Sequence, residues 1–323
     1  MDEFAPRKVT YLRMSITDRC NLRCGYCTYW QDWEKLPPGE ILSYEELLRL
    51  AAVAARIGIR KIRVTGGEPL VRRGIVDFLQ DLHQVPGINE VCLTTNGALL
   101  PELAPALYGA GLRHLNISLD TLRPDRYLQI TGRDYWQEVW TGIESALSLG
   151  FHPLKINCVA LKGLNDEEIM DLALLARDYP VQVRFIELMP TFSRAWWRRH
   201  YLPMAAVRRR LAGLGGLTPS NPGAAAGPAL VFSVPGFRGE LGFISPISQH
   251  HCPSCNRVRL TAAGRLRPCL LQELELDLKA PLREGVSDHA LAHLFLEAIR
   301  LKDLRWGFSL TGDTPFAMAR IGG

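Results

Sequence analysis

An alternation of short β-branched segments and helical patterns runs through the first 189 residues of the chain. The β-branched segments begin at Val9, Lys61, Glu90, His114, Pro153 and Val181. Helical patterns lie between them, and the first opens with Ser43 and Glu46 at capping-box spacing and ends at Gly58. Such alternation predicts parallel strands joined by right-handed crossovers. Six units predict an α/β fold, a partial (βα)6 TIM-like barrel. A doubly wound sheet is less favoured, because no glycine-rich dinucleotide-binding turn follows the first strand.

Length and pattern together predict three regions. A chain of 323 residues exceeds the usual size of a single hydrophobic core. After Met189 the alternation stops, and a segment rich in Arg and Trp is followed by one rich in Ala, Gly and Pro. We therefore predict a partial barrel over 1–189, a variable loop or linker over 190–230, and a C-terminal region over 231–323.

The cysteine content points to metal or redox chemistry. The chain has eight cysteines, no apolar run long enough to span a membrane and no secretory signal, so we expect it to act in the cytoplasm. Disulfides are rare there, which leaves metal binding as the main use of clustered cysteines. The net charge of +5 does not distinguish a nucleic acid from a small polyanion as partner.

Three cysteines lie close together in the stretch TDRCNLRCGYC. Cys20, Cys24 and Cys27 follow the first predicted strand in a C-x3-C-x2-C spacing. Closely spaced thiolates of this kind suit a [4Fe–4S] cluster. Three ligands for four irons leave one iron open, and an open iron can bind and reduce a small molecule. A structural zinc site is less favoured because it needs a fourth ligand, and no further Cys or His lies close by.

This spacing, with an aromatic residue before the third cysteine, resembles the signature of radical S-adenosylmethionine (SAM) enzymes. The resemblance implies that the open iron chelates the methionine part of SAM and that an electron from the cluster produces a 5′-deoxyadenosyl radical. The stretch TGGEP, from Thr65 to Pro69, ends the second predicted strand and resembles the segment that binds the amino group of SAM in this family. Its paired glycines allow backbone to approach a ligand closely.

A second group of cysteines occurs near the C-terminus. Cys252, Cys255 and Cys269 follow a C-x2-C-x13-C spacing, and His250 or His251 could complete a Cys3His zinc site. The remaining cysteines, Cys92 and Cys158, fall inside predicted strands and are expected to be small buried core residues.

The order of both motifs resembles the GTP 3′,8-cyclase family, the radical SAM lyases that begin molybdenum cofactor biosynthesis. The similarity runs from YLRMSITDRCNLRCGYC through KIRVTGGEPLVRR, LTTNG, NISLD, GFISPIS and CPSCNRVRL to the terminal IGG, and matches little of 190–228. It implies a second [4Fe–4S] cluster, in a C-terminal region that closes the barrel mouth, whose open iron binds the purine of GTP. The implied product is (8S)-3′,8-cyclo-7,8-dihydroguanosine 5′-triphosphate.

Polar residues at the carboxyl ends of the predicted strands are candidate site residues, because barrels of this kind place their active sites there. They are Thr94, Thr95, Asn96, Ser118, Asp120, Lys155, Asn157, Arg184, Glu187 and Met189. Half of them could instead be caps or turn residues. Lys155 lies between Leu154 and Ile156, so alternation directs it away from both of them, into the barrel.

The resemblance assigns roles to some of these positions. It implies SAM contacts at Tyr26, Gly67, Ser118 and Met189, and GTP contacts at Arg13, Arg63, Thr94, Lys155, Arg257, Val258 and Arg259. Arginine forks and a lysine suit a triphosphate. From the charge pattern alone, a solvated basic surface remains an alternative.

The C-terminal Gly322 and Gly323 would ordinarily be a frayed end. The resemblance implies that this double glycine reaches into the active site.

The resemblance also implies GTP as substrate, an electron donor protein, and a downstream cyclic pyranopterin monophosphate synthase as a partner. We expect the protein to bind neither nucleic acid nor membrane and to be a monomer or a homodimer. A radical enzyme that modifies a peptide and a zinc-ribbon nucleic-acid binder are the alternatives.

Overall fold

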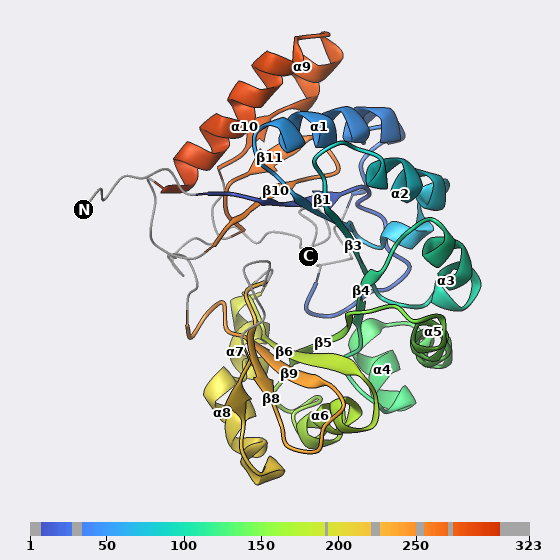
Figure 1. The fold of residues 1–323 in the computed structure, drawn as a ribbon. Coiled ribbons are helices and arrows are strands. Elements are labelled where there is room, and N and C mark those ends of the chain that lie inside the picture. The colour runs from blue at the N-terminus through green and yellow to red at the C-terminus, as the bar shows by residue number, and fades with distance from the viewer. Residues whose placement is uncertain are drawn as a thin grey trace.

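The computed structural model describes residues 8–27, 34–190, 193–220, 227–249, 255–270 and 274–303. These residues form one curved sheet of twelve strands, with most helices on its outer surface (Figure 1). Cys252, His250, His251, Gly322 and Gly323 lie outside the described residues.

The first six strands follow one another in parallel and confirm the predicted partial barrel. They are β1 (Tyr11–Ser15), β2 (Lys61–Thr65), β3 (Glu90–Thr95), β4 (His114–Ser118), β5 (Leu154–Ala160) and β6 (Val181–Glu187). The connecting helices are α1 (Tyr44–Arg56), α2 (Ile75–His83), α3 (Leu100–Gly109), α4 (Pro124–Thr131), α5 (Trp136–Leu149) and α6 (Ile169–Asp178). The predicted capping box is present, since Ser43 accepts a hydrogen bond from the Glu46 amide and the Glu46 carboxylate accepts one from the Ser43 amide.

Residues after 200 extend this sheet at both of its edges. Beyond β6 lie β9 (Glu240–Ile244), β8 (Leu230–Ser233) and β7 (Thr218–Pro219), and beyond β1 lie β10 (Arg257–Leu260), β11 (Arg265–Arg267) and β12 (Leu276–Asp277). β9 pairs in parallel with β6, and β10 pairs in parallel with β1. Within the described chain, eight consecutive strands therefore run parallel. The alternation in the sequence predicted only six of them.

Further helices pack around the later part of the chain. They are α7 (Arg194–His200), α8 (Met204–Arg210), α9 (Lys279–Arg283) and α10 (Asp288–Asp303), and short 3-10 helices cover η1 (Pro38–Glu40), η2 (Pro69–Val71) and η3 (Ala212–Leu214). α10 packs beside α1, where Arg49 pairs with Asp288 at 2.9 Å (Figure 1). No helix in the described part of the chain combines the length and apolar character that a membrane span requires.

Candidate active site

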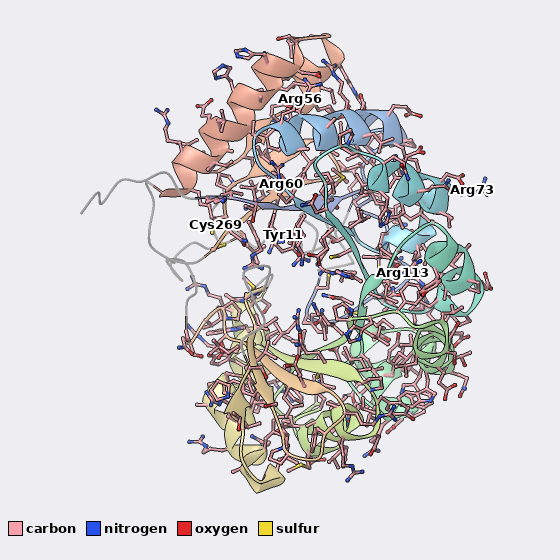
Figure 2. The ribbon with its side chains drawn as sticks, viewed as in Figure 1. Tyr11, Arg56, Arg60, Arg73, Arg113 and Cys269 are labelled. Carbon is pink, nitrogen blue, oxygen red and sulfur yellow. The ribbon has the colours of Figure 1, made fainter. Side chains whose placement is uncertain are left out.

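A cavity of about 400 Å³ lies inside the curve of the sheet. Its lining includes the described cysteines of both groups, namely Cys20, Cys24, Cys27, Cys255 and Cys269. In Figure 2, Tyr11 and Cys269 lie toward this hollow, whereas Arg73 and Arg113 lie at the periphery. Two cysteine groups that are far apart in the sequence thus open onto one cavity, because β10 returns the chain to the side of β1.

The paired glycines of TGGEP allow one stretch of backbone to pack against the segment that leads into Cys20. The amide of Gly67 donates to the Thr17 carbonyl at 2.7 Å, and the Glu68 amide donates to the Arg19 carbonyl at 2.7 Å. A Cβ on Gly67 would lie 2.3 Å from the Arg19 oxygen, so no other residue fits without movement. These glycines were expected to let backbone approach a ligand closely, and here they let it approach another segment of the same chain. Gly67 also lines the cavity.

Glu68 joins the end of β2 to the end of β3. Its carboxylate accepts hydrogen bonds from the Thr95 hydroxyl at 2.7 Å and the Asn96 amide at 2.6 Å. Asn96 in turn donates to Asn21 at 2.7 Å, next to Cys20. Burial raises the pKa of Glu68 to about 7. The cysteine segment is thus held by hydrogen bonds to two strand ends.

Tyr26 fixes the other side of the cysteine segment. Its hydroxyl donates to Asp120 at 2.7 Å, and the second oxygen of Asp120 accepts from the Val159 amide at 2.8 Å. Burial raises the pKa of Asp120 to about 6. Tyr26 therefore has the anchoring contact expected of a loop aromatic, and it lines the cavity as well.

The Arg- and Trp-rich segment after Met189 packs behind the same cysteines. Trp196 of α7 contacts a small apolar cluster around Ile130, Leu161 and Leu188, and Tyr26 packs against the same cluster. A Cβ built on Gly25 would lie 3.8 Å from the Trp196 ring. This segment supports the cysteine loop from outside the cavity.

The thiols of the first group have the electrostatic properties expected of metal ligands. Burial raises the pKa of Cys20 to about 11 and raises that of Cys24 well above its usual range, and the neighbouring Cys27 adds to the effect on Cys24. Three adjacent, partly buried thiols can be ionised together only if cations compensate their charge. The residues present therefore fit an iron–sulfur cluster.

The second group has a different electrostatic environment. Burial alone would raise the pKa of Cys255, but Arg257 and Lys302 lower it to about 6. Lys302 donates to the Cys255 sulfur at 3.3 Å. Cys255 and Cys269 both line the cavity. A site rich in cations favours thiolate ligands, which also fits a cluster.

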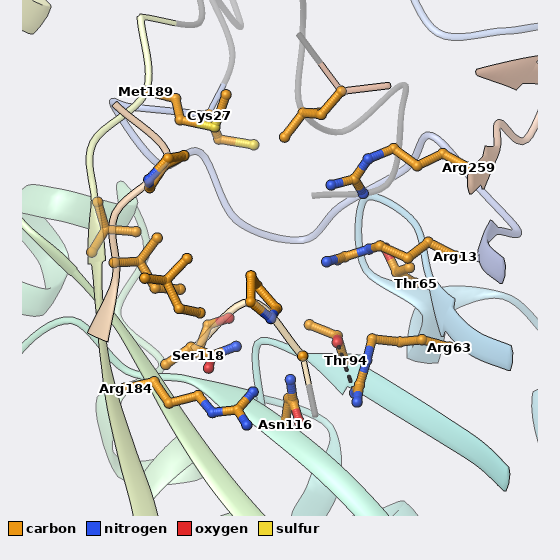
Figure 3. Close-up of a pocket in the computed structure, with 18 of the residues that line it drawn as sticks. Arg13, Cys27, Arg63, Thr65, Thr94, Asn116, Ser118, Arg184, Met189 and Arg259 are labelled. Carbon is orange, nitrogen blue, oxygen red and sulfur yellow. Dashed lines mark hydrogen bonds between the residues drawn. The ribbon is translucent and has the colours of Figure 1, made fainter. Parts of the chain in front are cut away.

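Basic side chains dominate the rest of the cavity wall. The lining contains eight basic residues, Arg13, Lys61, Arg63, Lys155, Arg184, Arg257, Arg259 and Lys302, against three carboxylates, Glu68, Asp120 and Glu187. The strand register places Arg13 beside both Arg63 and Arg259. Figure 3 shows these three guanidinium groups directed from one wall toward the cavity, with Arg184 across from them and Asn116 between Arg184 and Arg63.

The crowding of cations lowers the pKa values of several of them. Burial, together with Arg184 and Arg63, lowers the pKa of Lys155 to about 7. Burial and nearby arginines likewise lower the pKa of Arg13 and of Arg184 to about 10. Like charges held together in a cavity raise its free energy when it is empty, so the cavity is suited to a polyanion.

Most of the predicted site residues meet at this cavity. All ten of the strand-end residues line it, as do Arg13, Tyr26, Arg63, Gly67, Arg257 and Arg259. β5 alternates as expected, so Lys155, Asn157 and Val159 face the cavity while Cys158 is buried in the core. Val258 is the exception, because it is fully buried in the core and does not line the cavity.

Sequence reasoning missed Lys61, Asn116 and Lys302. Lys61 lies two positions before Arg63, and Asn116 two positions before Ser118, so alternation along β2 and β4 was the available signal. Lys302 lies in a helix, and no local pattern marks it.

The hydroxyl of Tyr127 and the side-chain oxygen of Asn157 are buried in the cavity wall without a hydrogen-bond partner among the described residues.

A separate cluster lies where β3 and β4 begin. Cys92 is fully buried, as expected, but its sulfur is 3.1 Å from Glu90 and 3.8 Å from His114. The three ligand atoms lie within 4.8 Å of one another, as in a metal site. Lys61 already pairs with the same Glu90 oxygen at 2.6 Å, and a cation there disfavours a metal. We interpret the cluster as an ion network that supports Lys61.

Comparison with known protein families gives consistent matches. Residues 14–176 match the model of the radical SAM superfamily, and residues 181–308 match the model described as Molybdenum Cofactor Synthesis C. Proteins named GTP 3′,8-cyclase from Pelotomaculum thermopropionicum and Heliobacterium modesticaldum are each 46% identical, over 100% of both chains. That of Moorella thermoacetica is also 46% identical over 100% of both chains.

Solved structures show the same fold. Streptococcus suis SuiB bound to S-adenosylmethionine matches with a TM-score of 0.60 at 14% identity, over 89% of this chain and 68% of that chain. At this identity the likeness concerns the fold alone. Taken with the family models and the full-length relatives, it leads to one conclusion: the chain belongs to the radical SAM superfamily, in the same family as the GTP 3′,8-cyclases, and as a radical SAM protein it uses SAM and an iron–sulfur cluster.

Proposed function

We propose that this protein converts GTP to (8S)-3′,8-cyclo-7,8-dihydroguanosine 5′-triphosphate, the first step of molybdenum cofactor biosynthesis. The names of its full-length relatives support this assignment. The observation that carries it is a single cavity with cysteines of both groups in its wall and eight basic side chains around it.

Cys20, Cys24 and Cys27 would hold the cluster that works with SAM. When bound, this cluster and SAM supply one-electron chemistry that abstracts a hydrogen atom. Tyr26, Gly67, Ser118 and Met189 all line the cavity, and we assign them to SAM binding. The hydrogen bond from Tyr26 to Asp120 keeps the cysteine segment in place, so this part of the SAM site would be formed before SAM binds.

The triphosphate would bind to the cations of β1, β2, β5 and β10. Arg13, Arg63, Lys155, Arg257 and Arg259 were implied by the family resemblance, and we add Lys61 and Arg184 because they share the cavity wall. Thr94 hydrogen-bonds with Arg63 at 3.4 Å and would help to orient its guanidinium group (Figure 3). Val258 pairs with Leu12 and would contribute by keeping Arg257 and Arg259 in place on either side of it.

The guanine would lie toward Cys255 and Cys269. We propose that Cys252, Cys255 and Cys269 hold a second [4Fe–4S] cluster whose open iron binds the purine. The unpartnered side-chain oxygen of Asn157 can accept a hydrogen bond from a hydroxyl or amine of a ligand in the cavity. A peptide substrate is the alternative for a radical enzyme with a second cluster. It would not account for the eight basic side chains in the cavity wall.

The reaction also implies partners outside the chain. We propose that an electron donor protein reduces the first cluster and that a cyclic pyranopterin monophosphate synthase uses the product. We propose that Gly322 and Gly323 act in the cavity during cyclisation.

The decisive experiment is anaerobic incubation of the reconstituted protein with GTP, SAM and a strong reductant, followed by mass analysis of the nucleotide. Two clusters predict roughly eight irons and eight sulfides per chain. Formation of 5′-deoxyadenosine without any cyclised nucleotide would refute the proposed substrate. Protein that holds zinc at the second site after reconstitution would refute the second cluster.

A further inference from the structure

Lys302 near the end of α10 is a buried lysine in the wall of the cavity. Only 7% of it is exposed. Its ammonium group donates to the Cys255 sulfur at 3.3 Å and to the Pro268 carbonyl at 2.9 Å. It forms no ion pair with a carboxylate of any described residue. A buried ammonium group needs compensating charge, and among its contacts only the sulfur can become an anion.

These two contacts connect the two described cysteine segments of the second site. Cys255 comes just before β10, and Pro268 comes just after β11 and directly precedes Cys269. β10 and β11 are antiparallel neighbours, so these two segments lie at the same end of the pair. Lys302 therefore bridges them from a third element, and its contacts do not require a bound cluster.

We propose that Lys302 is a positioning residue for the second cluster. Its side chain holds the Cys255 and Cys269 segments together and raises the reduction potential of the cluster that they bind. This inference rests on the proposed function, because it requires the second site to carry a cluster. Hydrogen bonds to ligand sulfurs and nearby positive charge both favour the reduced form of an iron–sulfur cluster, since that form is the more negative.

Three variants separate the charge and donor of Lys302 from its bulk. Lys302→Met keeps the length of the side chain and removes both the charge and the donor, whereas Lys302→Arg keeps both. Arg300→Met is the matched control, because Arg300 is on the same helix, carries the same charge and is exposed. Each protein is reconstituted anaerobically, its iron is counted, and its clusters are titrated with reductant while their paramagnetic signals are recorded.

The second cluster is identified by the signal that disappears in Cys255→Ala. We expect Lys302→Met to shift the potential of this cluster to more negative values and to slow its assembly, while the first cluster keeps its potential. Lys302→Arg should restore most of the shift, and Arg300→Met should match the wild type. An unshifted potential in Lys302→Met would overturn the proposal. So would an Arg variant that behaves as the Met variant, because the site would then need the shape of lysine and not its charge.

Failure of the proposed function has a different signature. If Cys255→Ala retains all the iron of the wild type, the second cluster is wrong, and the inference about Lys302 fails with it. If Cys255→Ala loses about half of the iron and Lys302→Met leaves the potential of the second cluster unchanged, only the inference about Lys302 is wrong.

Discussion

Lys155 shows how a single residue can link substrate binding to pH. In the absence of ligand, burial and neighbouring cations lower its pKa to about 7, so its charge changes with pH in the neutral range. A bound triphosphate would favour the charged form and raise this pKa.

Affinity for GTP should therefore fall as the pH rises above 7. Below that pH the lysine is already charged, whereas above it binding requires the uptake of a proton, with a limiting slope of about tenfold per pH unit. Lys155→Met should bind about tenfold to a hundredfold more weakly at pH 6.5 and should lose this part of the pH dependence.

The measurement is calorimetric titration of GTP between pH 6 and 9, in buffers of different ionisation enthalpy. Lys279→Met is a suitable control, because Lys279 pairs with Glu40 away from the cavity. Equal pH dependence in the wild type and Lys155→Met would contradict the assignment.

Gly67 is a second residue with a sharp expectation. A methyl group there would collide with the Arg19 carbonyl at 2.3 Å, so Gly67→Ala should displace the segment that leads into Cys20. We expect a loss of stability of about 1–3 kcal/mol and a loss of iron from the first site. Gly109→Ala is the control, because nothing lies within 4 Å of a Cβ at that position. Thermal unfolding and iron analysis distinguish the two, and normal iron content in Gly67→Ala would refute the expectation.

At the scale of elements, the beginnings of β2, β3 and β4 are joined by an ion network. Hydrogen bonds to Cys92 and Glu90 raise the pKa of His114 to about 9. Although burial opposes it, hydrogen bonds from His114 and Lys61 hold the pKa of Glu90 well below its usual range. The beginnings of these three strands are thus tied together by charge.

This network predicts a pH dependence of stability. A histidine with a raised pKa stabilises the fold fully below its unfolded pKa of about 6.5, and the contribution is lost as the pH rises through about 9. The free energy of unfolding should therefore decrease between pH 7 and 9.5, and His114→Asn should show a smaller decrease. Chemical denaturation at several pH values measures this. Identical slopes in both proteins would show that folding does not raise the pKa of His114.

For the molecule as a whole, the dominant feature is the collection of cations that strands from both halves of the sheet direct into one cavity. Repulsion among them destabilises the empty protein, and an anion that bridges the cavity relieves it. We expect GTP to raise the unfolding temperature, with a gain of about 2.7 kcal/mol at a hundred times its dissociation constant.

Inorganic tripolyphosphate should stabilise the protein partly, and guanosine should do so much less. Added salt should raise the unfolding temperature of the empty protein and reduce the increment from GTP, because it screens the same charges. Scanning calorimetry of the protein alone and with each of these ligands, at low and at high salt, tests this, and equal stabilisation by guanosine and GTP would argue against a phosphate site.

The sequence predicted those parts of this architecture that are encoded locally. The alternation along β5 directed Lys155 inward, and the capping box placed the start of α1, because both depend on neighbouring residues. The pairing of β10 with β1 brings together segments from opposite ends of the chain, and no local period encodes it. The role of Lys302 depends on that pairing, so it became visible only in three dimensions.

The position of β10 also has a consequence for biosynthesis. A ribosome completes β1 long before it reaches β10. The edge of β1 that pairs with β10 in the folded protein therefore stays unpaired until most of the chain has been made, although most side chains of β1 are apolar and become buried on folding. Open apolar edges are sites of aggregation. Both outer edges of the six-stranded sheet are closed by residues after 229, so a fragment that ends after β6 would leave β1 and β6 exposed together. The first six strands of this chain therefore depend on the segment that follows them to cover both edges of their sheet.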